Sequence, residues 1–332
     1  MRSHAERGNE DGYIVPAEAV PMPRFFDLQG HRGARGLHPE NTLPSFEAAF
    51  DAGVNTVETD LHLTHDNVVV LSHDPFLSAS HCRQLEPAAV PLATRPAIRS
   101  LLLSQLRCYA ADCNPDPARF PDQTGIVTPV AARFAEERGV HPYAIPTLAD
   151  LFSFAAACAG PLGEQAGKTP QQRACAGRVR FDLELKRVPF HPEYIGDGYT
   201  GVGPALLEQK TLEAVRSAGV VGRINVRSFD HRCVAQLLAL EPRLTGAVLI
   251  AGTAPLRPGG VAWEVGASMY CPEFEFLDAE LVGEAHASAL RVVPWTANEE
   301  DVWRRLLEIG VDGITTDFPD RLAACLRSWG IV

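Results

Sequence analysis

The segment Phe181–Lys186, FDLELK, decides the fold class, because its apolar and charged residues alternate strictly. Side chains two residues apart on a β-strand share one face of the sheet. The apolar face carries Phe181, Leu183 and Leu185, which can pack beneath outer helices. The charged face carries Asp182, Glu184 and Lys186, which would then point into the interior of a barrel.

Strand patterns recur along the chain and alternate with helical patterns, which is typical of βα units and a parallel sheet. Eight runs are predicted as strands: Phe25–Gly30, Thr56–Leu61, Val179–Leu185, Arg223–Val226, Thr245–Ile250, Ala267–Tyr270, Arg291–Trp295 and Gly313–Thr316. Seven segments are predicted as helices: Thr42–Ala52, Leu148–Ala157, Pro204–Ala218, Asp230–Leu240, Asp278–Ala289, Glu299–Ile309 and Pro319–Trp329. We expect Asn41 to cap the first helix, and Thr147 with Asp150 to open the second.

Residues 77–144 interrupt this alternation, because they are rich in proline, alanine and arginine and show weak periodicity. A structureless loop of that length would be unusual in a compact fold. We therefore predict an α/β fold, a (β/α)8 TIM barrel over residues 25–330, with 77–144 as an insertion after the second strand that has some structure of its own.

A second pair of carboxylates, Glu58 and Asp60, lies two residues apart on a predicted strand, as Asp182 and Glu184 do. Unpaired carboxylates inside a barrel are costly, and a bound cation would offset that cost. Three of them, Glu58, Asp60 and Glu184, would form an oxygen site suited to Mg²⁺, Ca²⁺ or Mn²⁺ rather than zinc. Each strand taken alone fits an exposed edge strand with solvated charges equally well.

Two of the eleven histidines directly follow predicted strands or apolar runs: His31 and His73. Active sites of barrels form at the ends of strands. Two histidines beside a metal suit phosphodiester cleavage, because one can remove a proton while the other protonates the leaving alkoxide. His62 would share a face with Glu58 and Asp60 and stays ambiguous. A structural role is expected for His38, His81, His141, His191 and His286.

The 332 residues carry a formal net charge of -11, which argues against nucleic-acid binding, and 46% of them are hydrophobic, which is enough for a large core. No run of about 18 apolar residues indicates a membrane span. Eight cysteines fit either disulfides in an oxidising compartment or buried thiols. The cysteines favour a periplasmic or secreted protein, whereas residues 1–24 lack an apolar signal segment and favour the cytoplasm. The oligomeric state cannot be predicted.

The order of the short motifs resembles the glycerophosphodiester phosphodiesterase family. The resemblance covers roughly residues 27–325 apart from 77–144, and the combination is specific although each motif alone is weak. The motifs are HRGARG at His31–Gly36, PENTLPSF at Pro39–Phe46, VETDL at Val57–Leu61, VVLSHD at Val69–Asp74, IPTL at Ile145–Leu148, LELK at Leu183–Lys186, SF at Ser228–Phe229, PWTAN at Pro294–Asn298 and DGITTDFP at Asp312–Pro319.

The resemblance implies a barrel, a divalent metal (Mg²⁺ or Ca²⁺, with Mn²⁺ possible) and hydrolysis of glycerophosphodiesters to sn-glycerol 3-phosphate and an alcohol. The residues it implies are His31 and His73 as the acid–base pair, Glu58, Asp60 and Glu184 as metal ligands, Arg32 and Lys186 at the phosphate, and Trp295 beside the glycerol, unless Trp295 belongs to the barrel core. Glu40 would support a ligand or histidine. Alternatives are a lysophospholipase D-like lipid phosphodiesterase and a non-catalytic glycerophosphodiester-binding protein.

One position departs from the family pattern. Arg227 stands where the family often has glutamine before Ser-Phe. This arginine could contact an acidic head group, or it could point outward from the barrel. The specificity for the alcohol therefore stays open.

Overall fold

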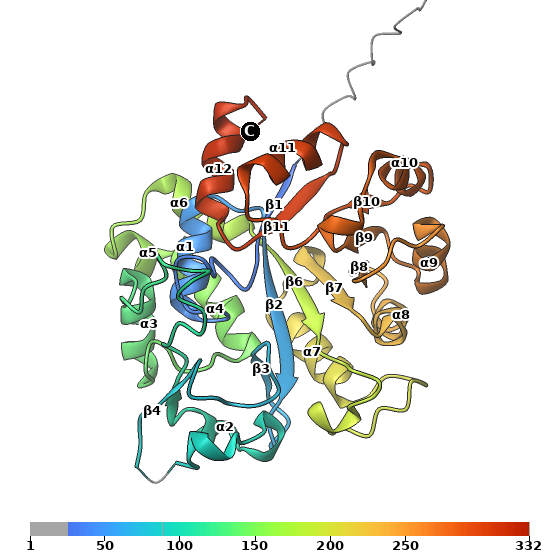
Figure 1. Ribbon diagram of the computed structural model, residues 1–332. Helices are drawn as coiled ribbons and strands as arrows, with labels where there is room; N and C mark the ends of the chain where they lie inside the picture. Colours follow the sequence, from blue (N-terminus) through green and yellow to red (C-terminus); the bar gives the residue numbers. More distant parts are fainter. Residues whose placement is uncertain (1–25, 88, 332) are drawn as a thin grey trace, which may run out of the picture.

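The computed structural model describes residues 26–87 and 89–331, and in Figure 1 its strands gather at the centre with helices around them. Eight parallel strands form the ladder, in the order β10, β9, β8, β7, β6, β2, β1, β11. Their bounds are β1 Asp27–Gly30, β2 Thr56–Leu63, β6 Arg180–Leu185, β7 Ile224–Ser228, β8 Thr245–Ile250, β9 Met269–Pro272, β10 Arg291–Val292 and β11 Gly313–Thr316. The predicted (β/α)8 barrel is thus confirmed.

The two end strands of the ladder meet through backbone hydrogen bonds. Asp312 N donates to Val292 O at 2.9 Å, and Thr315 N donates to Pro294 O at 3.0 Å. Strand β10 is shorter than the predicted Arg291–Trp295, since Pro294 has no N–H to donate to a ladder. Trp295 lies just beyond the strand, where its backbone N–H still donates to Pro272 O.

Helices cover the outside of the barrel. Their bounds are α1 Leu43–Ala52, α4 Leu148–Ala159, α6 Pro170–Arg178, α7 Leu206–Ser217, α8 His231–Leu240, α9 Pro258–Val265, α10 Ala279–Ala287, α11 Glu300–Glu308 and α12 Pro319–Ser328. All seven predicted helices are present. Sequence patterns missed α6 and α9, and Gly259 and Gly260 weaken the helical signal of α9.

The prediction of the first helix cap was wrong. Thr42 is the N-cap of α1, and its side chain accepts a hydrogen bond from Ser45 N. Asn41 instead has a φ of 56° and directs its side chain inward, where Nδ2 donates to Asp60 Oδ2 at 2.9 Å. The other predicted cap is confirmed, since Thr147 and Asp150 form a capping box at α4.

The connection between β2 and α4 contains several short elements. Strand β3, Val69–Leu71, pairs antiparallel with β2, and β4, Arg83–Gln84, pairs with β5, Tyr109–Ala110. The helical pieces are η1 Leu92–Thr94, η2 Ile98–Ser100, α2 Leu103–Leu106 and α3 Pro129–Arg138. A small apolar cluster around Leu77, Ile98, Leu106 and Tyr109 holds part of this region together. That residues 77–144 form a unit inserted in a 25–330 domain stays a prediction.

The remaining short elements lie at the edges of the barrel: α5 Pro161–Gln165, η3 Pro192–Tyr194, η4 Val221–Arg223 and η5 Phe274–Phe276. No described helix has the length and apolar character needed to cross a bilayer.

All eight cysteines are free thiols, and five of them are buried, which matches the buried-thiol interpretation. Cellular location stays a prediction, and the signal segment considered for residues 1–24 lies outside the described residues.

Candidate active site

Three carboxylates converge inside the barrel. In the register of β2 and β6, Asp60 lies beside Glu184, and Glu58 precedes Asp60 on the same face. One oxygen from each of Glu58, Asp60 and Glu184 lies within 4.8 Å of the others. The alternative of solvated charges on an edge strand is wrong, since all three residues are buried and both strands have neighbours on each side.

Burial and mutual repulsion shift the pKa values within this carboxylate cluster. Burial and the adjacent Asp60 raise the pKa of Glu58 to about 8. Burial alone would also raise the pKa of Asp60, but Lys186 and Arg32 hold it well below its ordinary value. Glu58 Oε1 accepts no hydrogen bond among the described residues. An all-carboxylate donor set with a buried oxygen that accepts no hydrogen bond fits a hard divalent cation.

Two cations lie directly against Asp60 and Glu184. Lys186 Nζ is 2.8 Å from Glu184 Oε1 and 3.4 Å from Asp60 Oδ1. Arg32 Nε is 3.3 Å from Asp60 Oδ2, and its Nη1 donates to both oxygens of Glu40 at 2.9 Å. Glu40 therefore fixes an arginine, rather than a ligand or histidine as the resemblance implied.

His31 is held between two carboxylates. Its Nδ1 is 2.6 Å from Asp317 Oδ1, and its Nε2 is 3.8 Å from Glu58 Oε2. Burial outweighs the attraction of Asp317 and lowers the pKa of His31 to about 4, so the ring is neutral at pH 7. Because the neutral ring carries its proton on Nδ1 and donates it to Asp317, Nε2 is unprotonated, and its lone pair points toward the carboxylate cluster.

His73 lies on the loop that follows β3 and lines the same pocket as His31. Its Nδ1 is 2.8 Å from Asp74 Oδ1, and its side chain is about one-third exposed. The ambiguous His62 is buried, and its Nε2 lies 3.2 Å from the backbone oxygen of His73. His62 thus supports the loop of His73 rather than facing the pocket.

Trp295 forms part of an aromatic wall. Its Nε1 donates to Cys271 O at 2.9 Å, and its ring meets Phe229 edge to face at a centroid distance of 5.7 Å. Both rings line the pocket and are partly exposed, so Trp295 is not simply barrel core. Phe229 belongs to the Ser-Phe motif, but nothing in the sequence indicated that its ring faces the pocket.

Arg227 points into the barrel, which decides between the two orientations left open by the sequence. Its side chain is 2% exposed and lies 3.3 Å from both Glu58 Oε1 and Asp182 Oδ2. The charge of this arginine is therefore directed at the floor of the pocket.

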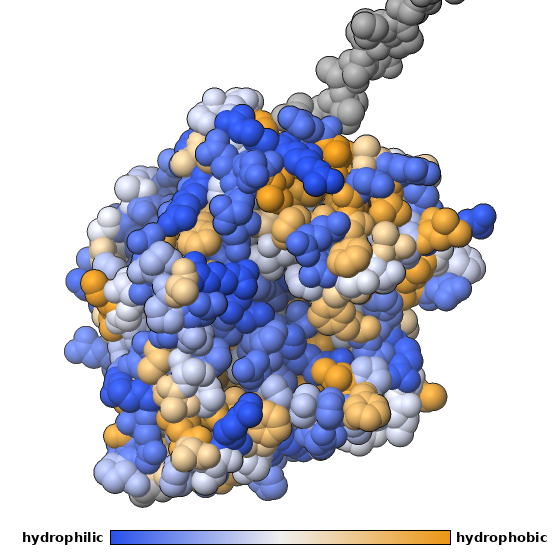
Figure 2. Space-filling model, in the orientation of Figure 1, coloured by the Kyte–Doolittle hydropathy of each residue, from blue (hydrophilic) through white to orange (hydrophobic). Residues whose placement is uncertain are grey.

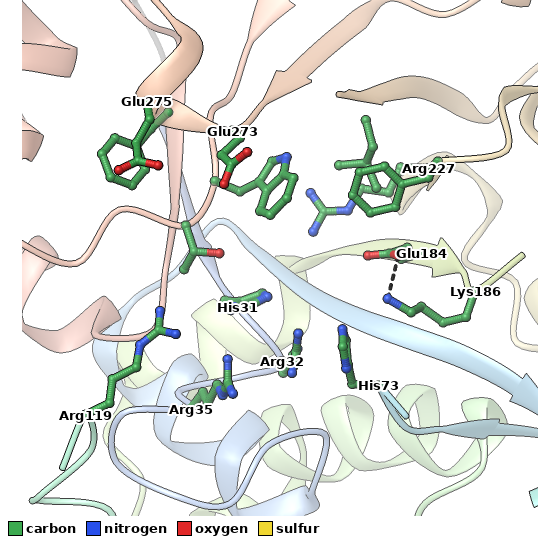
Figure 3. A pocket seen from close by; sticks show the side chains of 15 residues that line it. His31, Arg32, Arg35, His73, Arg119, Glu184, Lys186, Arg227, Glu273 and Glu275 are labelled. Carbon is green, nitrogen blue, oxygen red and sulfur yellow. Dashed lines mark hydrogen bonds and ion pairs between the residues drawn. The ribbon is translucent and has the colours of Figure 1, made fainter. Parts of the chain in front are cut away.

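All eight predicted site residues come together at one hollow in the molecule. Figure 2 shows a hydrophilic depression near the centre of the face, and Figure 3 shows the side chains around it. The pocket has a volume of about 410 Å³ and is lined by His31, Arg32, Arg35, His73, Arg119, Glu184, Lys186, Arg227, Phe229, Leu249, Glu273, Phe274, Glu275, Trp295 and Thr296. Glu58 and Asp60 lie beneath it, in contact with His31, Arg32 and Lys186.

Sequence reasoning missed two further parts of the site. Asp317 lies within the motif Asp312–Pro319, but the motif alone does not indicate its contact with His31. Arg119 comes from the region with the weakest sequence pattern, and it reaches Asp317 Oδ2 at 3.3 Å. The pattern of residues 77–144 carries no signal that could have placed Arg119 at the pocket.

Comparison with known proteins agrees with this geometry. The profile of the glycerophosphoryl diester phosphodiesterase family matches residues 31–321. The chain belongs to this family. A glycerophosphodiester phosphodiesterase of Bacillus altitudinis is 26% identical over 88% of this chain and 94% of its own length. The family prediction and the prediction of an enzyme are therefore confirmed, and the alternative of a non-catalytic binding protein is set aside.

Solved structures support the fold. A Silicibacter pomeroyi protein assigned as a glycerophosphoryl diester phosphodiesterase has a TM-score of 0.72 and 27% identity, covering 94% of this chain and 96% of its own. An Oleispira antarctica phosphodiesterase, solved with its product sn-glycerol-3-phosphate, has a TM-score of 0.62 at 18% identity. It covers 91% of this chain and 96% of its own.

Proposed function

We propose that this enzyme hydrolyses glycerophosphodiesters to sn-glycerol 3-phosphate and an alcohol, with a divalent cation and two histidines. The observation that carries the proposal is the convergence of His31, His73 and a buried three-carboxylate cluster at one pocket. Family membership supports the substrate class. The Oleispira enzyme, which shares the fold, holds sn-glycerol-3-phosphate as its product.

Glu58, Asp60 and Glu184 would hold the metal, for which Mg²⁺, Ca²⁺ and Mn²⁺ are all suitable. When bound, the cation would supply positive charge that polarises the phosphate. Arg32 and Lys186 lie against the same carboxylates, so their charges face the place where a phosphate would lie. Fixed positive charge at this point stabilises the charge that grows on the phosphate oxygens in the transition state.

The two histidines would move the protons. One would take a proton from the attacking oxygen, either water or the glycerol 2-hydroxyl, which would give a cyclic phosphate that water then opens. The other would give a proton to the departing alkoxide as its bond to phosphorus breaks. His31 is held in one orientation by Asp317, and His73 by Asp74. Trp295 and Phe229 would form the wall beside the glycerol.

Release of sn-glycerol 3-phosphate tests the proposal. Purified enzyme is given glycerophosphodiesters with choline, ethanolamine or glycerol as the alcohol, with and without EDTA, and then with Mg²⁺, Ca²⁺ or Mn²⁺ restored. We expect release that EDTA abolishes and a metal restores. Lysophosphatidylcholine is included as a lipid substrate, and activity on it alone would favour the lysophospholipase D-like alternative. No release together with no metal binding would refute the mechanism.

A further inference from the structure

Arg35 and Arg119, here called the arginine pair, lie at one end of the pocket. Their guanidinium carbons are 4.8 Å and 5.1 Å from the centre of the same ring, that of Phe120. Phe120 is fully buried and contacts Phe318 at a centroid distance of 6.0 Å. In Figure 3 both guanidinium groups are directed toward the cavity. A rigid aromatic support therefore holds two cations from distant parts of the chain at one place.

The arginine pair shares its two carboxylate partners with other groups. Asp317 lies 3.3 Å from Arg119 and 4.0 Å from Arg35, but it also binds His31 and Asn298. The second carboxylate, Glu40, binds Arg35 at 2.8 Å. Glu40 is also shared with Arg32. Neither arginine of the pair therefore has a carboxylate to itself.

Arg119 has donors left for a ligand. Its side chain is 49% exposed, and a guanidinium carries five N–H groups. Among the described residues, its side chain makes one hydrogen bond, from Nη2 to Asp317 Oδ2. The acidic side chains of the pocket rim, Glu273 and Glu275, lie across the cavity from it in Figure 3. Charge is therefore distributed unevenly, with the arginine pair on one side and Glu273 and Glu275 on the other.

We propose that the arginine pair is a subsite for a second anionic group on the alcohol part of the substrate. The inference rests on the proposed function, which places the scissile phosphate between Arg32 and Lys186 and leaves the aromatic wall to the glycerol. A guanidinium fork matches the oxygens of a phosphate or carboxylate. Glycerophosphodiesters whose alcohol carries such a group are then preferred over those with a neutral alcohol or with cationic choline.

Two matched substrates test this subsite: glycerophosphoglycerol, and the same molecule with a phosphate on its terminal hydroxyl. The initial rate at which each diester is consumed gives its kcat/KM, because the alcohol released from the phosphorylated substrate is itself a glycerol phosphate. We expect wild-type enzyme to prefer the phosphorylated substrate, and Arg119→Ala to reduce that preference about tenfold, mainly through KM. Arg119→Glu reduces it further, and Arg119→Lys reduces it less, because lysine keeps the charge but loses the fork.

Arg133→Glu is the matched control for Arg119→Glu. Arg133 is exposed on α3, away from the pocket, so its substitution changes the net charge of the protein by the same amount without altering the pocket. It should leave the preference unchanged. An equal loss on both substrates in Arg119→Ala would mean that Arg119 acts through Asp317 and His31, and would overturn the subsite. No change in the preference would overturn it as well. If wild-type enzyme releases product from neither substrate, the proposed function itself is wrong and the subsite falls with it.

Discussion

His31 Nδ1 and Asp317 Oδ1 lie 2.6 Å apart, although 286 positions separate them in the chain. β1 ends just before His31 and β11 just before Asp317, and these two strands are neighbours in the barrel. Asn298 fixes the carboxylate from the other side, because its Nδ2 donates to Asp317 Oδ2 at 2.8 Å and its Oδ1 accepts from Asp317 N at 2.9 Å. Asp317 therefore orients the imidazole and keeps the proton on Nδ1.

The first prediction concerns this pair. We expect Asp317→Asn to lower kcat roughly 100-fold while the metal affinity stays close to that of the wild type, because an amide no longer selects the Nδ1–H form of His31. Steady-state kinetics and a metal titration measure the two effects. Asp301→Asn, in the exposed first turn of α11, is the control for the loss of one negative charge. Unchanged kcat in Asp317→Asn would show that His31 needs no such orientation.

The second prediction separates the two histidines from the metal site. We expect His31→Ala and His73→Ala each to lower kcat by roughly two to four orders of magnitude, because each removes one proton transfer. Circular dichroism should show an intact fold, and neither variant should lose the ability to bind metal. His191→Ala serves as the control, since that histidine is partly exposed on the loop after β6 and does not line the pocket. Near-normal turnover in either pocket variant would exclude that histidine from the mechanism.

The third prediction tests the carboxylate cluster. Glu184→Gln should weaken metal binding by at least about tenfold, because the amide removes one of the three negative charges that hold the cation. Calorimetric titration of the metal-free protein with Mn²⁺ measures the affinity directly. Glu273→Gln is a matched control, because Glu273 lines the same pocket but lies outside the cluster. Equal affinities in wild type and Glu184→Gln would refute the assignment of Glu184.

Most of the fold and the centre of the site follow from local sequence patterns. The strict alternation at Phe181–Lys186 requires one buried apolar face and one inward charged face, so it predicted both the strand and the direction of Glu184. A helix cap was predictable only where the sequence offers a single suitable capping residue, as at Thr147. At Asn41 and Thr42 two good capping residues are adjacent, and the buried bond of Asn41 to Asp60 decides between them.

What the sequence could not predict depends on contacts between distant segments. Arg119 reaches the pocket from a region without periodicity, and Phe120 and Asp317 hold it there. The inward direction of Arg227 follows from its place on β7 beside Glu184 of β6, which requires the register of two parallel strands. Partners of this kind are set by the closed barrel, and no local pattern in the chain encodes them.

Arg227 and Asp182 provide the fourth prediction. Asp182 is fully buried, neither of its carboxylate oxygens accepts a hydrogen bond among the described residues, and Arg227 lies 3.3 Å away. Burial raises the pKa of Asp182, and Arg227 opposes that rise. Removing one partner of a buried ion pair leaves the other charge uncompensated. We therefore expect Arg227→Gln to lower the free energy of unfolding by about 3 kcal/mol.

The double variant isolates the interaction. In Arg227→Gln the buried carboxylate of Asp182 has lost its partner, and Asp182→Asn removes that unpaired charge. The double variant should therefore lose less free energy of unfolding than the two single variants together, by at least about 1 kcal/mol. Urea unfolding of the metal-free proteins measures each loss from the midpoint, provided that the slope is unchanged. The double variant should not regain the full stability of the wild type. Arg227 also lies 3.3 Å from Glu58, and the carboxylate of Glu58 loses this partner in the variant. Strict additivity would mean that Asp182 and Arg227 do not stabilise each other.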